Sequence, residues 1–151
     1  MDKKEILRKI EERTGNTMVS TIGIEITDFG EEYLCGKMPV DDRTKQPFGL
    51  LHGGASVAFA ETLGSMGAGM HVDLENYSVV GIEINSSHLK AMKEGWVYGK
   101  AVPIRIGRKI QVCDKDIKDK KDNISDEIES LKEDLAEAND CLLYTSDAAD
   151  E

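Results

Sequence analysis

The residues of this sequence that are best suited to chemistry lie close together, between Gln46 and Ser65. Glu61 is the only acid between Asp42 and Asp73, in a segment otherwise built from small and apolar residues. A carboxylate in such surroundings is costly unless it has a partner or a chemical role. Ser65 follows four residues later, on the same face of a helix, where its hydroxyl is able to hydrogen-bond Glu61 or a water molecule.

A second chemical feature is the start of the same helix, where His52 is followed by Gly53 and Gly54. A helix that opens with two glycines leaves backbone N–H groups unpaired and unshielded, so a polarised carbonyl or an oxyanion can approach them. We therefore expect an oxyanion hole at Gly53. Each feature has an ordinary alternative, since a histidine often caps a helix, loops use glycine freely and a lone helical glutamate can pair with a buried base.

The distance between these two features predicts a shared site. At a rise of 1.5 Å per residue, Glu61 lies about 12 Å along the helix from Gly53, too far for both to touch one reacting carbon. If they act together, they must come from different subunits whose helices run antiparallel across a two-fold axis. We expect a homodimer, or a homotetramer built from it, with composite sites.

The elements that position these residues follow from the hydrophobic pattern. We predict a helix over 2–14, a β-hairpin over 18–40, a loop over 41–51, a helix from Gly53, and strands over 78–86, 95–103 and 109–118. The strand-like runs are rich in β-branched residues and their connections are short. The economical arrangement is an α+β fold, with an antiparallel sheet wrapped around one long central helix.

Composition excludes several classes of protein. The chain has 151 residues and a net charge of −10, of which −1 falls on residues 1–113 and −9 on residues 114–151. Without a basic stripe, nucleic acid is not an expected partner. No apolar run approaches the roughly 20 residues of a membrane span, so we expect a cytoplasmic protein that does not bind membranes. Three cysteines without a C-x-x-C spacing argue against a disulfide framework or a metal site.

The run QPFGLLHGGASVAFAETLGS, followed by VVGIEINSSHLKAMKEGWVYGKAVPIRIGRKIQVC, resembles a known family. It is similar to the hotdog-fold acyl-CoA thioesterases of the phenylacetate-pathway and 1,4-dihydroxy-2-naphthoyl-CoA type. The resemblance covers residues 1–123, which we take as a hotdog domain. It implies hydrolysis of an acyl-CoA thioester, with an aromatic or medium-size acyl group, to a free acid and CoA. No cofactor is implied, because CoA is part of the substrate.

The resemblance also implies roles for particular residues. Glu61 would be the nucleophile or the base that activates water, and the Gly53 N–H would polarise the thioester carbonyl. Gln46 and His52 would position the carbonyl and the leaving thiolate, and Ser65 would orient Glu61 or the water. The groove for the CoA pantetheine and phosphates would be lined by Gly81, Asn85, Ser86, His88, Arg105, Gly107 and Arg108, of which the arginines suit phosphate.

The C-terminal part departs from the family pattern. Where a last apolar strand is expected, residues 124–140 have apolar residues at four-three spacing within an acidic sequence, which predicts a solvated amphipathic helix or a short coiled coil. The last strand of the sheet is then missing or replaced. Residues 141–151, CLLYTSDAADE, resemble a translated transposon adapter and are interpreted as non-biological. The alternative function, a non-catalytic hotdog module for acyl-CoA binding or protein interaction, rests on this part alone.

Overall fold

The computed structural model describes residues 2–123, 128–129 and 131–132 of the chain. Residues Met1–Asp119 form one compact unit, and the chain from Lys120 onward forms a second one. The first unit contains all the predicted site residues. Within the described parts of the chain, no helix is long and apolar enough to cross a membrane.

The elements follow the expected order, with one addition. They are α1 (Lys3–Thr14), α2 (Met18–Thr21), β1 (Glu25–Gly30), β2 (Tyr33–Pro39), α3 (Gly53–Gly69), β3 (Trp96–Ile106) and β4 (Gln111–Asp119). The predicted N-terminal helix, the hairpin, the helix from Gly53 and the last two strands are confirmed. The short helix α2 was not expected, and it delays the first strand to Glu25.

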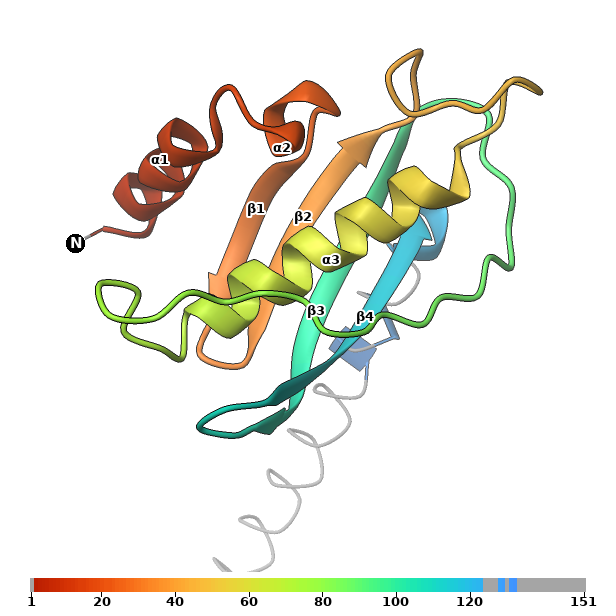
Figure 1. Ribbon diagram of the computed structural model, residues 1–151. Coiled ribbons are helices and arrows are strands. Elements are labelled where there is room, and N and C mark those ends of the chain that lie inside the picture. Colours follow the sequence, from red (N-terminus) through yellow and green to blue (C-terminus); the bar gives the residue numbers. More distant parts are fainter. Residues whose placement is uncertain (1, 124–127, 130, 133–151) are drawn as a thin grey trace, which may run out of the picture. The chain divides into compact units, whose positions relative to one another are not determined.

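The sheet confirms the predicted fold class. Its strands are antiparallel throughout and have the order β1-β2-β3-β4, with α3 lying across one face (Figure 1). The core lies between this face and α3, where Leu34, Met38, Phe59 and Leu63 are almost completely buried. This is the α+β hotdog arrangement of a sheet around a long central helix.

Two glycines allow α3 to lie close to the sheet. Gly36 on β2 is directly opposite Gly99 on β3. A Cβ atom on Gly99 would lie 2.6 Å from Cδ1 of Leu63, and one on Gly36 would lie 2.9 Å from Cδ2 of the same side chain. Leu63 and its neighbour Phe59 therefore occupy the space above Gly36 and Gly99 that the side chains of other residues would fill. This contact fixes the height of α3 above the strands, and with it the position of Glu61.

The predicted strand over 78–86 is wrong in this structure, because residues 78–92 form neither helix nor strand. A strand needs the backbone hydrogen bonds of a neighbour. In the sheet order, β4 is the terminal strand, and among the described residues no strand lies beyond it to pair with this segment. Apolar side chains on the segment are consequently exposed, including Val80, Ile82 and Leu89.

The second unit is described only in part. Residues 120–123, 128–129 and 131–132 are helical, and the other positions of the predicted acidic helix over 124–140 lie outside the described residues. The adapter-like segment 141–151 lies outside them entirely.

Candidate functional site

The N-terminus of α3 presents one backbone donor. The Gly54 N–H donates to Nδ1 of His52 at 2.8 Å, and the His52 carbonyl accepts from Ala55 and Ser56 at 2.9 and 3.2 Å. Among the described residues, the Gly53 N–H makes no hydrogen bond. The next three backbone N–H groups of α3 are all hydrogen-bonded, and that of Gly53 is not. The Gly53 N–H is therefore free to bind a ligand at the positive end of the helix dipole. The predicted oxyanion donor is therefore available.

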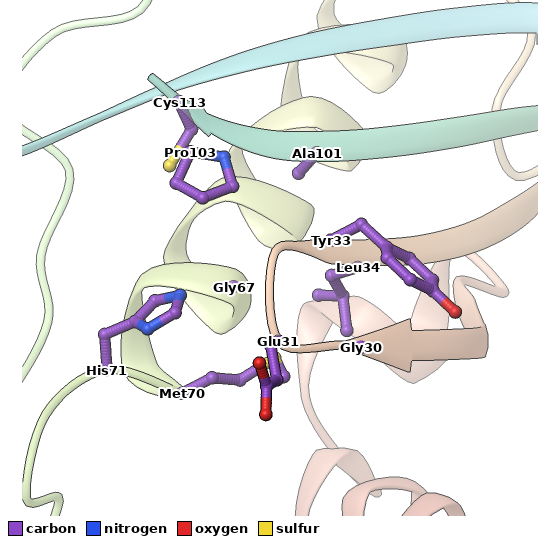
Figure 2. A pocket seen from close by; sticks show the side chains of 10 residues that line it. All are labelled: Gly30, Glu31, Tyr33, Leu34, Gly67, Met70, His71, Ala101, Pro103 and Cys113. Carbon is purple, nitrogen blue, oxygen red and sulfur yellow. The ribbon is translucent and has the colours of Figure 1, made fainter. Parts of the chain in front are cut away.

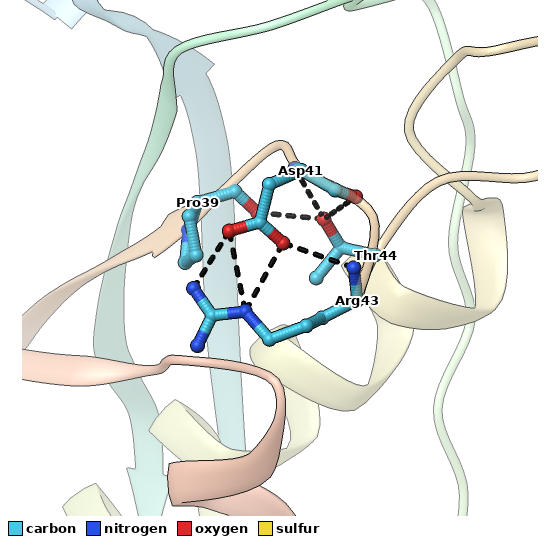
Figure 3. Close-up of polar contacts among 4 residues, drawn as sticks. All are labelled: Pro39, Asp41, Arg43 and Thr44. Carbon is cyan, nitrogen blue, oxygen red and sulfur yellow. Dashed lines mark hydrogen bonds and ion pairs between the residues drawn. The ribbon is translucent and has the colours of Figure 1, made fainter.

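The loop before α3 is held by a compact polar cluster (Figure 3). The buried Thr44 hydroxyl donates to the Pro39 carbonyl at 2.7 Å and accepts from the Asp41 N–H at 3.1 Å. The Arg43 guanidinium pairs with the Asp41 carboxylate at 2.7 Å. This hydrogen-bonded guanidinium holds the pKa of Asp41 below its usual range. Because the Thr44 carbonyl also accepts from the His52 N–H at 2.8 Å, the cluster anchors both ends of the loop.

Gln46 lies in this loop, and its side chain stabilises a turn. Its Oε1 accepts from the Phe48 N–H at 2.7 Å, and its own N–H donates to the Leu50 carbonyl at 2.8 Å. Gly49 has a φ of 75°, which only glycine adopts without strain. Gln46 is partly buried, whereas Phe48 is 89% exposed. Within one chain, Gln46 is thus near the start of α3 and does not contact Glu61.

Glu61 lies in the middle of α3 with a partly buried side chain. The predicted contact with Ser65 is present, since the Ser65 hydroxyl donates to Oε1 of Glu61 at 2.8 Å. Gly81 lies against the same carboxylate, because a Cβ atom there would be 2.2 Å from Oε1. Gly81 therefore lies directly beside the Glu61 carboxylate, a neighbour that the resemblance did not specify when it implied that Gly81 lines the groove for CoA.

Further along the same segment, His88 lies at the start of α3, beside the predicted oxyanion donor Gly53. A Cβ atom on Gly53 would be 2.9 Å from Nε2 of His88, so the imidazole packs directly on that glycine. The segment 78–92 therefore runs along α3 in the opposite sense to the helix. Between its two contacts, Asn85 donates to Glu83 at 3.0 Å and Ser86 is exposed.

The remaining predicted residues lie at the opposite end of α3. Arg105, Gly107 and Arg108 belong to the end of β3 and the turn into β4, and both arginines are exposed. The Gln111 side chain donates to the Ala68 carbonyl at 3.2 Å, which holds this hairpin beside the last turn of α3. A helix of 17 residues is about 25 Å long. In a single chain, the arginines are therefore separated from the Gly53 donor.

One pocket lies near this C-terminal end of α3, away from the predicted catalytic residues (Figure 2). The side chains of His71, Met70 and Cys113 line it together with the β1–β2 turn. None of the predicted site residues contributes to its wall. Among the described residues, no group of three His, Cys, Asp or Glu side chains is placed to hold a metal ion.

The sequence interpretation did not single out Lys115. Its side chain lies on α3, with Cε at 2.3 Å from where a Cβ atom of Gly64 would be. Lys115 thus brings a positive charge to Gly64 in the middle of the helix. Gly64 is three residues after Glu61. The signal was available in the period-two pattern of β4, because Lys115 alternates with exposed residues and shares a face with the core-packed Ile117.

The site consists of two parts that a single chain does not join. One part is the free Gly53 N–H with His52 and His88 beside it and Gln46 in the loop that precedes the helix. The other part is the Glu61 carboxylate with Ser65 and Gly81. A backbone donor suits a developing oxyanion, and a partly buried carboxylate suits attack on a carbonyl or activation of water.

Comparison with known proteins gives the class to which this fold and site belong. The family model described as the thioesterase superfamily matches residues 48–125, and the chain belongs to this superfamily. The matched region contains both parts of the site except Gln46.

Solved structures with substantial identity agree with this. The thioesterase HI1161 from Haemophilus influenzae is 46% identical, with a TM-score of 0.73 over 76% of this chain and 80% of that chain. A mutant of the thioesterase PA1618 from Pseudomonas aeruginosa is 41% identical, with a TM-score of 0.74 over 76% of this chain and 83% of that chain. A mutant of the thioesterase SAV0944 from Staphylococcus aureus is 36% identical, with a TM-score of 0.67 over 69% of this chain and 86% of that chain.

Proposed function

We propose that this chain hydrolyses an acyl-CoA thioester, with an aromatic or medium-size acyl group, to a free acid and CoA. The observation that carries the proposal is the Glu61 carboxylate, partly buried and bonded to Ser65, on the helix whose first N–H is free at Gly53. Relatives named as thioesterases support the reaction. The phenylacetate-pathway or 1,4-dihydroxy-2-naphthoyl-CoA subtype is proposed from the sequence motif.

In this mechanism, Glu61 attacks the thioester carbonyl or takes a proton from the water that attacks it. Negative charge develops on the carbonyl oxygen, which the Gly53 N–H stabilises together with the positive end of the helix dipole. The carbon–sulfur bond then breaks, and CoA leaves as the thiolate, positioned by Gln46 and His52. If Glu61 itself attacked the carbonyl, a water molecule then cleaves the resulting mixed anhydride and regenerates the Glu61 carboxylate. By either route, water supplies the oxygen of the free acid and the proton that neutralises the thiolate. The Ser65 hydroxyl holds one oxygen of the Glu61 carboxylate and leaves the other directed to the reacting atoms.

The site requires two chains. Glu61 lies about 12 Å along α3 from Gly53, so a carbonyl bound at one Gly53 meets Glu61 of a second chain. We propose a homodimer, or a homotetramer containing it, in which the α3 helices run antiparallel. Crystal structures of the relative from Staphylococcus aureus carry alanine in place of a glutamine and of a glutamate that are fifteen residues apart. Gln46 and Glu61 have the same separation in this chain, which supports their joint role.

The exposed arginines then have a place in the same dimer. An antiparallel arrangement of helices brings the C-terminal end of one α3, with Arg105 and Arg108 beside it, toward the Gly53 end of the other. Guanidinium groups pair with phosphate in bidentate geometry. We propose that these arginines bind the CoA phosphates, and that the segment carrying Asn85, Ser86 and His88 lies along the pantetheine.

The test is Glu61→Gln, which keeps the shape of the side chain and removes its charge. We expect kcat to fall by at least about 100-fold, with KM within a few-fold, in an assay of free-thiol release from a panel of acyl-CoA substrates. Glu75→Gln, which changes an exposed glutamate that has no role in the proposed site, is the matched control. Turnover of folded Glu61→Gln within a few-fold of the original chain would remove Glu61 from the mechanism. Binding of acyl-CoA by the original chain without any hydrolysis would favour the binding module instead.

A further inference from the structure

A lysine lies beside the proposed catalytic carboxylate with no partner of its own. Lys115 is partly buried where β4 passes α3, and its Nζ is 3.0 Å from where a Cβ atom of Gly64 would be. Among the described residues, the Lys115 ammonium forms no ion pair and no hydrogen bond. Withdrawing an ammonium from water without an opposite charge is unfavourable. The position of Lys115 therefore suits an anion that the described part of this chain does not supply.

The surroundings of this lysine confine its charge to one place. Gly64 is a buried residue of α3, and the absence of a side chain there lets the end of the lysine lie on the helix. The structure describes β4 in full, and along the face of the strand that alternates toward α3, Lys115 is the only positive charge. Ile117, the next residue on that face, packs on the core. The positive charge is thus held at one point along the helix, beside Gly64.

This point lies close to Glu61 but is not joined to it. Gly64 follows Glu61 by three residues, and residues at this spacing are neighbours on a helix, with Cβ atoms about 5–6 Å apart. Oε1 of Glu61 accepts from the Ser65 hydroxyl at 2.8 Å. In the part of the chain that the structure describes, no ion pair joins Glu61 and Lys115. The lysine is therefore available to a ligand whose reacting group is at Glu61.

The proposed function determines which part of a substrate reaches Lys115. The thioester carbonyl reacts at Glu61, and the CoA part follows residues 85–88 and the exposed arginines. The acyl group must leave the reacting carbon in another direction, along α3 and toward the sheet. On that route, Gly64 offers space and Lys115 offers a charge. A hydrocarbon group in this place would leave the ammonium unpaired, whereas a carboxylate would form a charge-assisted hydrogen bond with it.

We propose that the substrate of this chain is the CoA thioester of a dicarboxylic acid, whose far carboxylate pairs with Lys115. This proposal rests on the proposed function for the position of the thioester, and it specifies the acyl group that the sequence motif leaves open. The chain then selects against fatty acyl groups and unsubstituted aromatic acyl groups, because a site built for a polar group rejects an analogue that lacks it.

The test compares adipoyl-CoA with hexanoyl-CoA, whose acyl chains have the same length and differ in the terminal carboxylate. In the free-thiol assay, we expect kcat/KM of the original chain to be higher for adipoyl-CoA by about 10-fold or more. Lys115→Met keeps the length of the side chain and removes its charge, and the ratio of the two values should fall to about one. Lys118→Met is the matched control, because Lys118 alternates to the other face of β4 and pairs with Asp116 at 2.6 Å. This control should keep the original ratio.

Two kinetic results would overturn the proposal and leave thioester hydrolysis standing. The first is an equal kcat/KM for both substrates in the original chain. The second is a Lys115→Met variant that changes both values by the same factor, which would mean that the lysine only covers the helix with its ammonium in water.

Binding to Glu61→Gln chains tests the same pairing without hydrolysis. By isothermal titration calorimetry, we expect adipoyl-CoA to bind more tightly than hexanoyl-CoA by about 10-fold, and added salt to reduce this preference. Adding Lys115→Met to Glu61→Gln should abolish it. If the original chain hydrolyses neither substrate, the proposed function is wrong, and these affinities still decide the role of Lys115. Equal affinities, or no binding of either thioester, would overturn it.

Discussion

Replacing Gly99 by alanine tests how α3 is held against the sheet. A Cβ atom at this position would lie 2.6 Å from Cδ1 of Leu63 and 2.9 Å from Cε1 of Phe59. Both side chains are completely buried, so they cannot yield without moving α3. Overpacking of this kind costs about 1–3 kcal/mol. We expect Gly99→Ala to lower the free energy of unfolding by that amount.

A second change at the same contact gives the prediction its specificity. Leu63→Ala removes most of a fully buried side chain, which costs about 2–5 kcal/mol including the cavity. In the double variant, the new methyl group at position 99 occupies part of the vacated space. The combined loss is therefore smaller than the sum of the two single losses, by about 0.5–3 kcal/mol.

Urea unfolding followed by the fluorescence of Trp96, the single tryptophan, measures these quantities. Gly67→Ala is the control, because the nearest atom to its added Cβ would be at an ordinary 3.7 Å, from Leu34. Alanine in a helix interior is favoured over glycine by about 0.5–1 kcal/mol, so this variant should be slightly more stable. Strictly additive losses at Gly99 and Leu63, or a neutral Gly99→Ala, would refute the close packing of α3 on the paired glycines.

Two other changes test the polar contacts around the site and at the N-terminus. Thr44→Val leaves the Pro39 carbonyl without its 2.7 Å donor, and we expect it to lower the free energy of unfolding in urea by about 1–3 kcal/mol; an unchanged value would contradict the anchoring role of Thr44. Asp28 accepts hydrogen bonds from Lys3 and Tyr33, which lower its pKa from the ordinary 3.8. Because the pKa is lower in the folded chain, this contact stabilises above pH of about 4, and the stabilisation is lost as the pH falls through the folded value. We therefore expect Asp28→Asn to reduce the thermal midpoint at neutral pH and to flatten its decline in acid; an identical decline in both chains would show that the contact contributes nothing.

The part of the fold that the sequence predicts best is the part determined by local pattern. α3 was predictable from its glycine start and its run of mostly small and apolar residues, and its contact between Glu61 and Ser65 follows from helical spacing alone. The hairpin of β1 and β2 was predictable from alternation and its turn. These features depend on neighbours in sequence, which the pattern records.

Features that depend on distant partners were harder to predict. Residues 78–86 have strand composition, but a strand forms only when a neighbour supplies hydrogen bonds, and none of the described strands does so. The Gln46 side chain binds the Phe48 N–H in the turn, a contact that residue type does not specify. The period-two pattern of β4 gives the face on which Lys115 lies, but its approach to Gly64 depends on how β4 lies against α3, which the pattern does not give.

The central claim is that one chain supplies the Glu61 carboxylate and another supplies Gln46 and the Gly53 donor. It is tested by mixing Glu61→Ala chains with Gln46→Ala chains, each inactive alone, and measuring thiol release from an acyl-CoA. In a mixed dimer, one of the two sites receives Gln46 from one parent and Glu61 from the other. Random exchange of subunits therefore restores about a quarter of the original activity. Absence of recovery, with exchange of subunits demonstrated by native mass spectrometry, would contradict a site shared between two chains.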